Sequence, residues 1–275
     1  MTSSTLNTQE KFICDKFDIN LVSSLSLFLY EHLAFLMAKD QNEKVMLVHT
    51  ISFSNLEQLS ETISSDEIYK LDLPTRVYVH NHIFSLVPGM VFNPAFLNTY
   101  LAFAGEVNQK TSYSTALESN RIHIVGGVST NIHQLLSIGK TNIEFYHGAI
   151  SFLSYCFNEK LNLLNQEILI YFFENHFYLA AFSKQELMVF NRFEADNKDD
   201  LLKYTLGIIQ QLEFNRKLCR INVLGDFKSI GIDNEWGEIY FKNFKLTIPQ
   251  PNIIYHKSFD KTLESAALET SWAYI

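Results

Sequence analysis

Cysteine is scarce in this chain of 275 residues. The three cysteines, Cys14, Cys156 and Cys219, lie far apart, and no two of them have the C-x-x-C spacing of a redox motif or a zinc site. An odd number of widely spaced cysteines does not build a disulfide framework. We therefore predict three reduced thiols that are mostly buried as small apolar side chains.

Clusters of basic residues are also missing. The chain has 22 Lys and Arg against 30 Asp and Glu, which gives a formal net charge of −8. Nucleic acids and anionic membranes are bound chiefly through clustered Lys and Arg. The charge balance argues against both as the main partner, so that another protein is the expected partner.

A long apolar run is the third absence. The most apolar stretch, residues 25–38, is interrupted by Glu31 and His32 and is too short to span a bilayer. The first eight residues contain neither the basic region nor the apolar region of a signal peptide. We expect a cytoplasmic protein.

What the chain does contain is an internal repeat. His32 aligns with His176 at an offset of 176 − 32 = 144, and after a contraction of two residues Met46 aligns with Met188. The aligned segments are residues 25–39 with 169–183, 44–51 with 186–193, and 76–79 with 220–223. The repeat indicates a duplicated supersecondary unit, and 275 residues with 47% hydrophobic composition can fill two cores.

Each copy is predicted to begin with a three-stranded meander, over residues 25–53 and 169–194. Runs of β-branched and aromatic residues between short polar turns are typical of antiparallel strands. Helical spacing of apolar residues follows in both copies. Ser54 and Asp196 are the predicted helix caps, since each has an acidic residue three positions later.

The next strand in each copy, residues 76–79 or 220–224, is predicted to run parallel to a meander strand through a right-handed crossover. Beyond that strand the copies differ, because the first contains an insertion of about residues 84–120. The predicted domains are a first lobe with its insertion, residues 1–160, and a second lobe, residues 161–275.

The insertion is followed by further predicted elements. The first lobe continues with a strand at residues 122–125 and with a strand and a helix across residues 142–159. The second lobe ends with a strand at residues 245–248 and a helix over about residues 258–270.

A duplicated β-β-β-α-β-α unit resembles the organisation of the actin-like ATPase superfamily, which has a ribonuclease H-like fold. The chain also resembles an uncharacterised bacterial family, a domain of unknown function, that is assigned to this fold. The segment FSLVPGMVFNPAFLNTYLAF, residues 84–103, carries that second resemblance. The resemblance implies an α/β fold with mixed sheets in two lobes.

Nucleotide binding in that superfamily needs glycine in a phosphate loop of each lobe, because backbone N–H groups must reach phosphate oxygens. The corresponding turns here contain the acidic residues Glu31 and Glu174 but no glycine. A third motif, paired glycines against the adenosine, is half present, since Gly225 is followed by Asp226. If a vestigial nucleotide cleft is retained, these four residues are its remaining contacts.

Two other patterns have structural interpretations that we prefer. Gly126 and Gly127 lie between a predicted strand and a helix start, where N–H groups can face an anion, but the P-loop pattern is missing. His80 and His82 alternate on a predicted strand and share a face, as a metal pair would. The spacing indicates no third ligand, and we predict no metal site.

Aromatic residues recur at helical spacing in the insertion, namely Phe92, Phe96, Tyr100 and Phe103. Such a stripe is usually core, and any exposed members would mark an interface. Residues 271–275 form either a docking tail or, as we prefer, an aromatic cluster that closes the second core.

These patterns favour an actin-like protein without catalytic residues or cofactor, which acts as a cytoplasmic protein-binding or scaffolding element with degenerate nucleotide motifs. Its partner would be another protein or a second copy. The alternative is an ATP-binding enzyme or switch that uses the inter-lobe cleft. The sequence identifies neither the partner, the oligomeric state nor the biological process.

Overall fold

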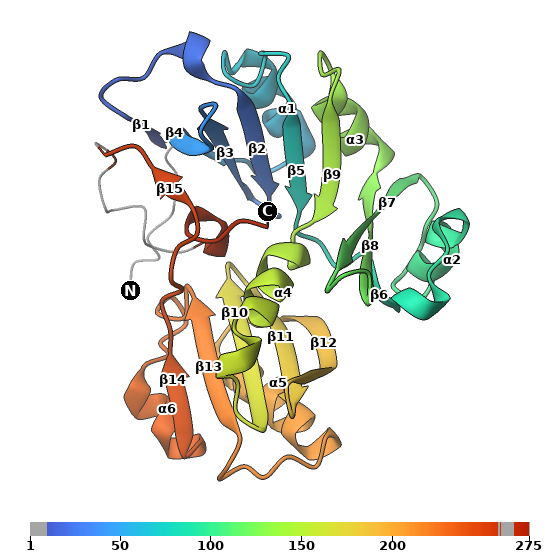
Figure 1. The fold of residues 1–275 in the computed structure, drawn as a ribbon, viewed down its shortest axis with the longest axis vertical. Coiled ribbons are helices and arrows are strands. Elements are labelled where there is room, and N and C mark those ends of the chain that lie inside the picture. The colour runs from blue at the N-terminus through green and yellow to red at the C-terminus, as the bar shows by residue number, and fades with distance from the viewer. Residues whose placement is uncertain (1–9, 258, 260–266, 275) are drawn as a thin grey trace. The chain divides into compact units, whose positions relative to one another are not determined.

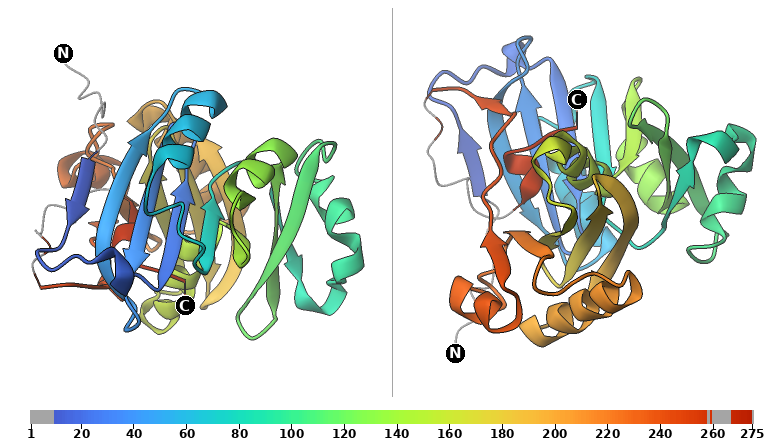
Figure 2. Two further views of the ribbon diagram at one scale, coloured as in Figure 1. Left: turned by 90° about the horizontal axis from the view of Figure 1, so that it is seen from above. Right: turned by 60° about the horizontal axis from the view of Figure 1, so that its bottom comes forward.

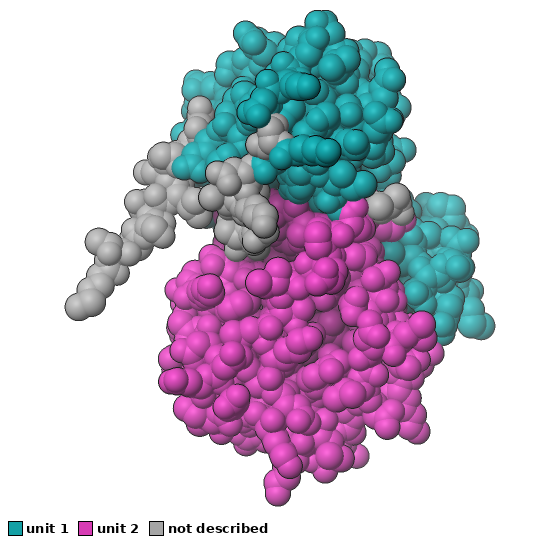
Figure 3. All heavy atoms as spheres, turned by 60° about the vertical axis from the view of Figure 1, so that its left-hand side comes forward, with its two compact units in different colours: residues 1–150, 253–260 teal, residues 151–252, 261–275 magenta. Residues whose placement is uncertain are grey.

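The computed structural model describes residues 10–257, 259 and 267–274. The chain divides into two compact units, which we call unit 1 (residues 1–150 and 253–260) and unit 2 (residues 151–252 and 261–275) (Figure 3). Each unit has a mixed sheet and a hydrophobic core of its own. The lobe boundary between residues 160 and 161 stays a prediction.

The large sheet of unit 1 has the strand order β1-β4-β3-β2-β5-β9 (Figure 1). Its strands are β1 (Glu10–Ile13), β2 (Ser24–Leu29), β3 (Leu33–Lys39), β4 (Lys44–Ser52), β5 (Thr75–Val79) and β9 (Ile143–His147), with β15 (Ile254–Tyr255) beside the start of β4. The strands β2, β3 and β4 are antiparallel neighbours, and β5 runs parallel to β2. The predicted meander and the predicted parallel strand are confirmed.

Unit 2 has the strand order β12-β11-β10-β13-β14. Its strands are β10 (Gln166–Phe173), β11 (His176–Ser183), β12 (Glu186–Glu194), β13 (Arg220–Gly225) and β14 (Asn243–Leu246). The first three form an antiparallel meander and β13 runs parallel to β10, with the order and directions of β4-β3-β2-β5 in unit 1. This agreement is what the internal repeat predicts.

A β-bulge occurs at the same aligned position in both units. The register between β3 and β4 skips Met46, and the register between β11 and β12 skips Met188. These are the two methionines that align in the repeat. The bulge bends the third meander strand and leaves one residue without a cross-strand partner.

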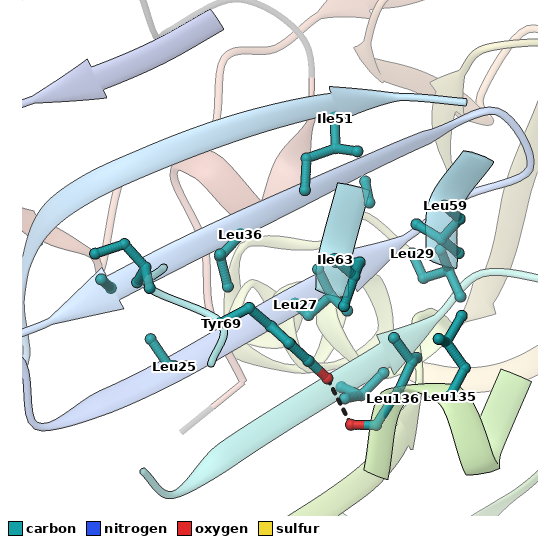
Figure 4. Close-up of a cluster of buried hydrophobic side chains, with 14 of the residues drawn as sticks. Leu25, Leu27, Leu29, Leu36, Ile51, Leu59, Ile63, Tyr69, Leu135 and Leu136 are labelled. Carbon is teal, nitrogen blue, oxygen red and sulfur yellow. Dashed lines mark hydrogen bonds between the residues drawn. The ribbon is translucent and has the colours of Figure 1, made fainter. Parts of the chain in front are cut away.

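The core of unit 1 lies on one face of its large sheet. Helices α1 (Leu56–Ser65) and α3 (Thr130–Ser137) cover this face (Figure 4). Alternate residues of β2 point into it, because side chains of a strand alternate between faces. The Tyr69 hydroxyl donates a hydrogen bond to the carbonyl oxygen of Leu136, 2.7 Å away, and ties the loop after α1 to α3.

The core of unit 2 has the same plan. Helix α5 (Lys198–Gln211) lies against the sheet of unit 2 (Figure 2). It buries Leu201, Ile208 and Ile209 in the core that residues of β10, β11 and β13 also form. Helix α6 (Asn234–Tyr240) contributes Trp236 to the same core. The three cysteines of the chain are buried free thiols, as predicted.

Both predicted helix caps are wrong by one residue. Helix α1 is capped by Asn55, whose side-chain oxygen accepts a hydrogen bond from the N–H of Gln58. Helix α5 is capped in the same way by Asn197. Ser54 instead donates its hydroxyl to the Gln58 side chain. Asparagine is as good a helix cap as serine or aspartate. The prediction relied on the spacing to an acidic residue three positions later, and that spacing selects the residue just before each asparagine.

A small three-stranded sheet of order β6-β8-β7 forms a module at one side of unit 1 (Figures 1 and 2). Its elements are β6 (Phe84–Pro88), β7 (Lys110–Leu117), β8 (Ile122–Ser129), helix α2 (Leu97–Leu101) and two 3-10 turns, Gly89–Val91 and Pro94–Phe96. Asn93 caps the turn that begins with Pro94, since its side-chain oxygen accepts the N–H of Ala95. The residues of β7 have no alternating apolar pattern, and no strand is predicted there from the sequence alone.

Two predictions near the C-terminus have different outcomes. The strand expected at residues 245–248 is present as β14 and lies two residues earlier. Most of the helix expected over residues 258–270 lies outside the described residues. Its described end, Leu268–Thr270, is a 3-10 turn.

A buried carboxylate organises unit 1. Asp66 accepts hydrogen bonds from the N–H groups of Ile68 and Tyr69, and its second oxygen lies 2.7 Å from His49 Nδ1 and 3.2 Å from Lys11 Nζ. Burial alone would raise the pKa of Asp66, but these hydrogen bonds and the Lys11 charge hold it well below its usual range. The carboxylate thereby joins β1, β4 and the end of α1.

We expect Asp66→Asn to lower the free energy of unfolding by about 1–3 kcal/mol at pH 7. The folded pKa of Asp66 is lower than the unfolded value of about 3.9, so its contribution is complete above about pH 4 and is lost as the pH falls further. Urea denaturation at several pH values measures this, with the exposed neighbour change Glu67→Gln as the control. A gap between wild type and Asp66→Asn that stays constant down to pH 2 would contradict the assignment.

Unit 2 contains a second buried carboxylate, Glu167. Its two oxygens accept hydrogen bonds from Nε and Nη2 of Arg220, at 2.8 and 2.7 Å, and the N–H of Leu164 donates to one of them at 2.8 Å. Glu167 is fully buried, and the pair lies across the first rung of the parallel ladder between β10 and β13. This bidentate geometry is the strong form of a carboxylate–guanidinium ion pair.

We expect Glu167→Met to destabilise unit 2 by about 3 kcal/mol, because it leaves the guanidinium group without its carboxylate. The double variant Glu167→Met with Arg220→Met should recover part of that loss, since no buried charge then remains unpaired. A double-mutant cycle on the free energy of unfolding measures the coupling. If the two changes lower the free energy of unfolding additively, the contact between Glu167 and Arg220 contributes nothing to stability.

Candidate functional site

Three of the four predicted site residues lie at one end of the unit 2 sheet. Glu174 is in the two-residue turn between β10 and β11, and Gly225 ends β13. Phe172 pairs with Gly225, and the N–H of Asp226 donates to the carbonyl oxygen of Phe172 at 2.8 Å. Glu31 occupies the equivalent turn of unit 1, between β2 and β3.

The backbone geometry of unit 2 requires glycine at position 225. Its φ is +92°, in the region that only glycine adopts easily. A Cβ atom on this residue would lie 2.0 Å from the carbonyl oxygen of Phe172. The close passage of β13 past the end of β10 therefore requires glycine with or without a ligand.

Asp226 is an unfavourable neighbour for a phosphate. Burial raises the pKa of its carboxyl group, and hydrogen bonds with Ser229 offset the burial only in part. The hydroxyl of Ser229 also donates to the Asp226 carbonyl oxygen at 2.7 Å and closes the turn after β13. When ionised, this carboxylate repels an anion at the same sheet end.

The two acidic turns do not form phosphate loops. Glu174 has a φ of +56°, so a residue with a Cβ atom occupies the left-handed position where glycine is usual. The carbonyl oxygen of Asn175 accepts the N–H of Ala195, which fixes the turn to β12. In unit 1 the exposed Glu31 and His32 form the turn. Neither turn contains the glycines that let successive N–H groups surround a phosphate.

An imidazole fills the corresponding strand end of unit 1. The N–H of His80 donates to the carbonyl oxygen of Leu29 at 2.8 Å, the contact that Asp226 makes in unit 2. The buried His80 ring stacks on Tyr30 with centroids 3.9 Å apart. A Cβ atom on Gly148 would lie 2.3 Å from this ring. Sequence reasoning missed this packing, because residues 30, 80 and 148 meet only in the folded sheet.

The expected strand pair of His80 and His82 is wrong. Strand β5 ends at Val79, so that His80 turns into the unit and His82 is exposed. Within the described ranges, no group of three or more His, Cys, Asp or Glu side chains is arranged to hold a metal ion.

The structural turn that we preferred at Gly126 and Gly127 is also wrong. Both glycines lie inside β8, and helix α3 begins only after Ser129. A Cβ atom on Gly126 would lie 2.5 Å from the Tyr113 ring, and one on Gly127 would lie 2.9 Å from Ile83. The glycines make room for aromatic and aliphatic side chains and do not present N–H groups to a ligand.

The aromatic stripe of the insertion divides between core and surface. Phe92 and Tyr100 are half-buried against the module core, and Phe92 stacks on His123 with centroids 3.7 Å apart. Phe96 and Phe103 are 52% and 86% exposed, and they flank the short helix α2, Phe96 at the end of the preceding 3-10 turn and Phe103 in the turn that follows.

Met90 and Val91 are exposed beside this segment, in the turn that the Tyr100 hydroxyl anchors through the Val91 carbonyl oxygen. We call Met90, Val91, Phe96 and Phe103 the module patch. It is the candidate functional surface of unit 1, because exposed apolar groups concentrated in one small module are typical of an interaction site.

The described C-terminal residues close unit 2, as we preferred. Trp272 packs edge-on against Tyr155 with centroids 5.4 Å apart, and its indole N–H donates to the Ser154 hydroxyl at 3.0 Å. The N–H of Ala273 donates to the side chain of Asn252.

Among the helices of the described residues, none has the length and apolar character needed to cross a membrane.

Comparison with known structures places the fold. A Bacteroides thetaiotaomicron protein described as having an actin-like ATPase fold and unknown function superposes with a TM-score of 0.73 and 14% identity, over 84% of this chain and 93% of that chain. A structure described as a PilM–PilN type IV pilus biogenesis complex gives a TM-score of 0.61 and 11% identity, over 89% and 94%. Curated protein sequences gave no significant match.

These similarities establish a mixed α/β chain with an actin-like ATPase fold, as the resemblance implied. A sequence-family model described as "Protein of unknown function (DUF3822)" matches residues 17–244, most of the chain. The chain therefore belongs to the DUF3822 family of proteins of unknown function.

Proposed function

We propose that this chain is a non-catalytic, actin-like protein of the bacterial cytoplasm that binds another protein through the module patch. The observation that carries the proposal is the exposure of Phe96 and Phe103 on either side of helix α2 in the inserted module. An aromatic side chain left in water forgoes about 1.5–3 kcal/mol of burial, and a partner that covers it recovers that energy.

The module has the rigidity that a binding surface needs. The Ser85 hydroxyl donates to the Tyr100 carbonyl oxygen, and the Tyr100 hydroxyl accepts the N–H of Asn93. These bonds fix α2 and the turn before it on the small sheet, so that little ordering entropy is lost on binding. One of the structures with this fold is described as a PilM–PilN type IV pilus biogenesis complex, which supports a protein partner for such a scaffold.

The strand-end geometry supports the lack of catalysis. Gly225 has a structural explanation, Asp226 adds negative charge, and the turns at Glu31 and Glu174 contain no glycine. These four residues remain candidate contacts only for a vestigial nucleotide-binding cleft.

We expect ATP with magnesium to leave the melting temperature unchanged. A ligand at a hundred times its dissociation constant stabilises a protein by about 2.7 kcal/mol, which thermal denaturation detects readily. Changes at Gly225 are unsuitable as a probe because they disrupt β13 itself. A concentration-dependent rise with ATP whose size changes in Asp226→Lys or Glu174→Lys would restore the nucleotide switch as the better hypothesis.

The partner site is tested with Phe96→Ser combined with Phe103→Ser. Both side chains are exposed, so the change should leave the melting temperature within about 2 °C of wild type. We expect the partner that co-purifies with the wild-type protein from its native cells to be lost. Leu218→Ser with Ile239→Ser, two exposed apolar residues of unit 2, is the matched control. Equal recovery of the same partner with both double variants would exclude the module patch.

A further inference from the structure

The outer edge of β14 is open. β14 is the last strand of the unit 2 sheet, and no strand of the described residues pairs with its outer side (Figure 1). Its counterpart in unit 1 is β9, which packs against the module, since Phe145 of β9 lies beside Tyr113 of β7 with ring centroids 6.2 Å apart. The described part of unit 2 has no such module. An open strand edge is a template for another strand.

Two residues of β14 direct their backbone groups away from the sheet. The N–H of Thr247 donates to the carbonyl oxygen of Val223 on β13 at 2.8 Å, so Thr247 faces inward. Backbone groups alternate in direction along a strand, and those of Phe244 and Leu246 therefore point outward. No hydrogen bond of the described chain uses these outward N–H and C=O groups. Because buried backbone groups are almost always paired, these groups face solvent.

The inner contacts of β14 hold the strand in place. The side-chain Nδ2 of Asn243 donates to the carbonyl oxygens of Lys217 and Leu218, at 3.2 and 3.3 Å. The Phe244 ring packs so closely on helix α6 that a Cβ atom on Gly237 would lie 2.0 Å from it. An edge that is already ordered loses little conformational entropy when a partner binds.

The surface around β14 is basic, although the chain as a whole is acidic. Residues 214–225 and 239–252, which contain β13 and β14, include no Asp or Glu, whereas the chain has 30 of these residues. The two segments contain the cationic residues Arg216, Lys217, Arg220, Lys242 and Lys245. Arg220 is paired with Glu167, and the other four are exposed.

Two hydrogen bonds gather these cations at the start of β14. Arg216 Nε donates to the carbonyl oxygen of Tyr240 at 2.6 Å, and Asn243 reaches the carbonyl oxygen of Lys217. The nearest acids along the chain, Glu213 and Glu238, lie outside the two segments. A local excess of cations beside an open edge favours an acidic partner and repels a basic one.

The outward backbone groups determine the class of that partner. Phe244 and Leu246 each offer a donor and an acceptor, in the alternation that a peptide backbone matches. The phosphate groups of nucleic acids and lipids are acceptors only, so they leave the outward C=O groups without donors. The edge and its charge together indicate an acidic peptide.

We propose that the outer edge of β14 binds an extended, acidic segment of another protein, which adds a strand to the unit 2 sheet. The backbone of the segment pairs with Phe244 and Leu246, and its carboxylates lie near Lys242 and Lys245. Ile248, which is 78% exposed just beyond the strand, supplies an apolar contact. The site involves neither the module patch nor the function proposed for that patch.

Synthetic peptides of about ten residues test the proposal on the full chain. One peptide alternates glutamate with valine, and the other alternates lysine with valine. We expect the acidic peptide to bind and to slow hydrogen exchange at the amides of Phe244 and Leu246. The amide of Thr247, already bonded to β13, should not change, and the lysine peptide should not bind. Absence of binding by the acidic peptide at about 1 mM, or binding that leaves both amides unprotected, would overturn the proposal.

Charge reversal tests the contribution of the lysines. Lys242→Glu combined with Lys245→Glu should weaken binding of the acidic peptide about tenfold or more. Both side chains are exposed, so the melting temperature should stay within about 2 °C of wild type. Lys203→Glu with Lys228→Glu reverses two other exposed lysines of unit 2 and is the matched control. Equal weakening by both double variants would show that only net charge matters and would exclude the β14 edge.

Two further measurements identify a different occupant of the edge. Inorganic polyphosphate should compete weakly with the acidic peptide and should not protect the amides of Phe244 and Leu246. Polyphosphate that protects both amides as fully as the peptide would assign the surface to anions in general. Protection that rises with protein concentration alone would assign the edge to a second copy of the chain. Either result would contradict the proposal.

Discussion

The parallel pairing of the first meander strand with the strand after the helix is the constraint on which both units depend. In unit 1, β5 runs beside β2, and in unit 2, β13 runs beside β10. This pairing requires a helical crossover over one sheet face, so it sets where α1 and α5 lie and which side chains form each core. It also brings the hairpin turn and the next strand end to the same edge of the sheet.

The two units use that edge differently, although their backbones make the same contact there. His80 and Asp226 donate equivalent N–H groups to the preceding meander strand. In unit 1 the space beyond is filled by the stacked rings of His80 and Tyr30. In unit 2 the chain passes so close to Phe172 that residue 225 must be glycine. Residues that resemble parts of a nucleotide motif are thus accounted for by packing and backbone geometry.

Polar groups in both units serve mainly to fix strand neighbours. Asp66 joins β1 to β4 and α1, and Glu167 with Arg220 joins β10 to β13. The strand β1, which Asp66 holds through Lys11, pairs with the outer side of β4 in unit 1, and β15 pairs with the start of β4. Among the described residues, no strand pairs with the outer side of β12, the position that β1 and β15 occupy beside β4.

The sequence by itself determined the repeat, the two meanders, the parallel strands and the actin-like organisation, because strand and helix periodicities are local and are written twice in this chain. Tertiary structure decided the rest. Asn55 and Asn197 became caps through backbone geometry that the acidic spacing did not reveal. Gly126 and Gly127 lie inside β8, where side chains of other segments occupy the space that their Cβ atoms would need. The exposure of Phe103 depends on which segments fold over it, and that is a property of long-range contacts rather than of any local pattern.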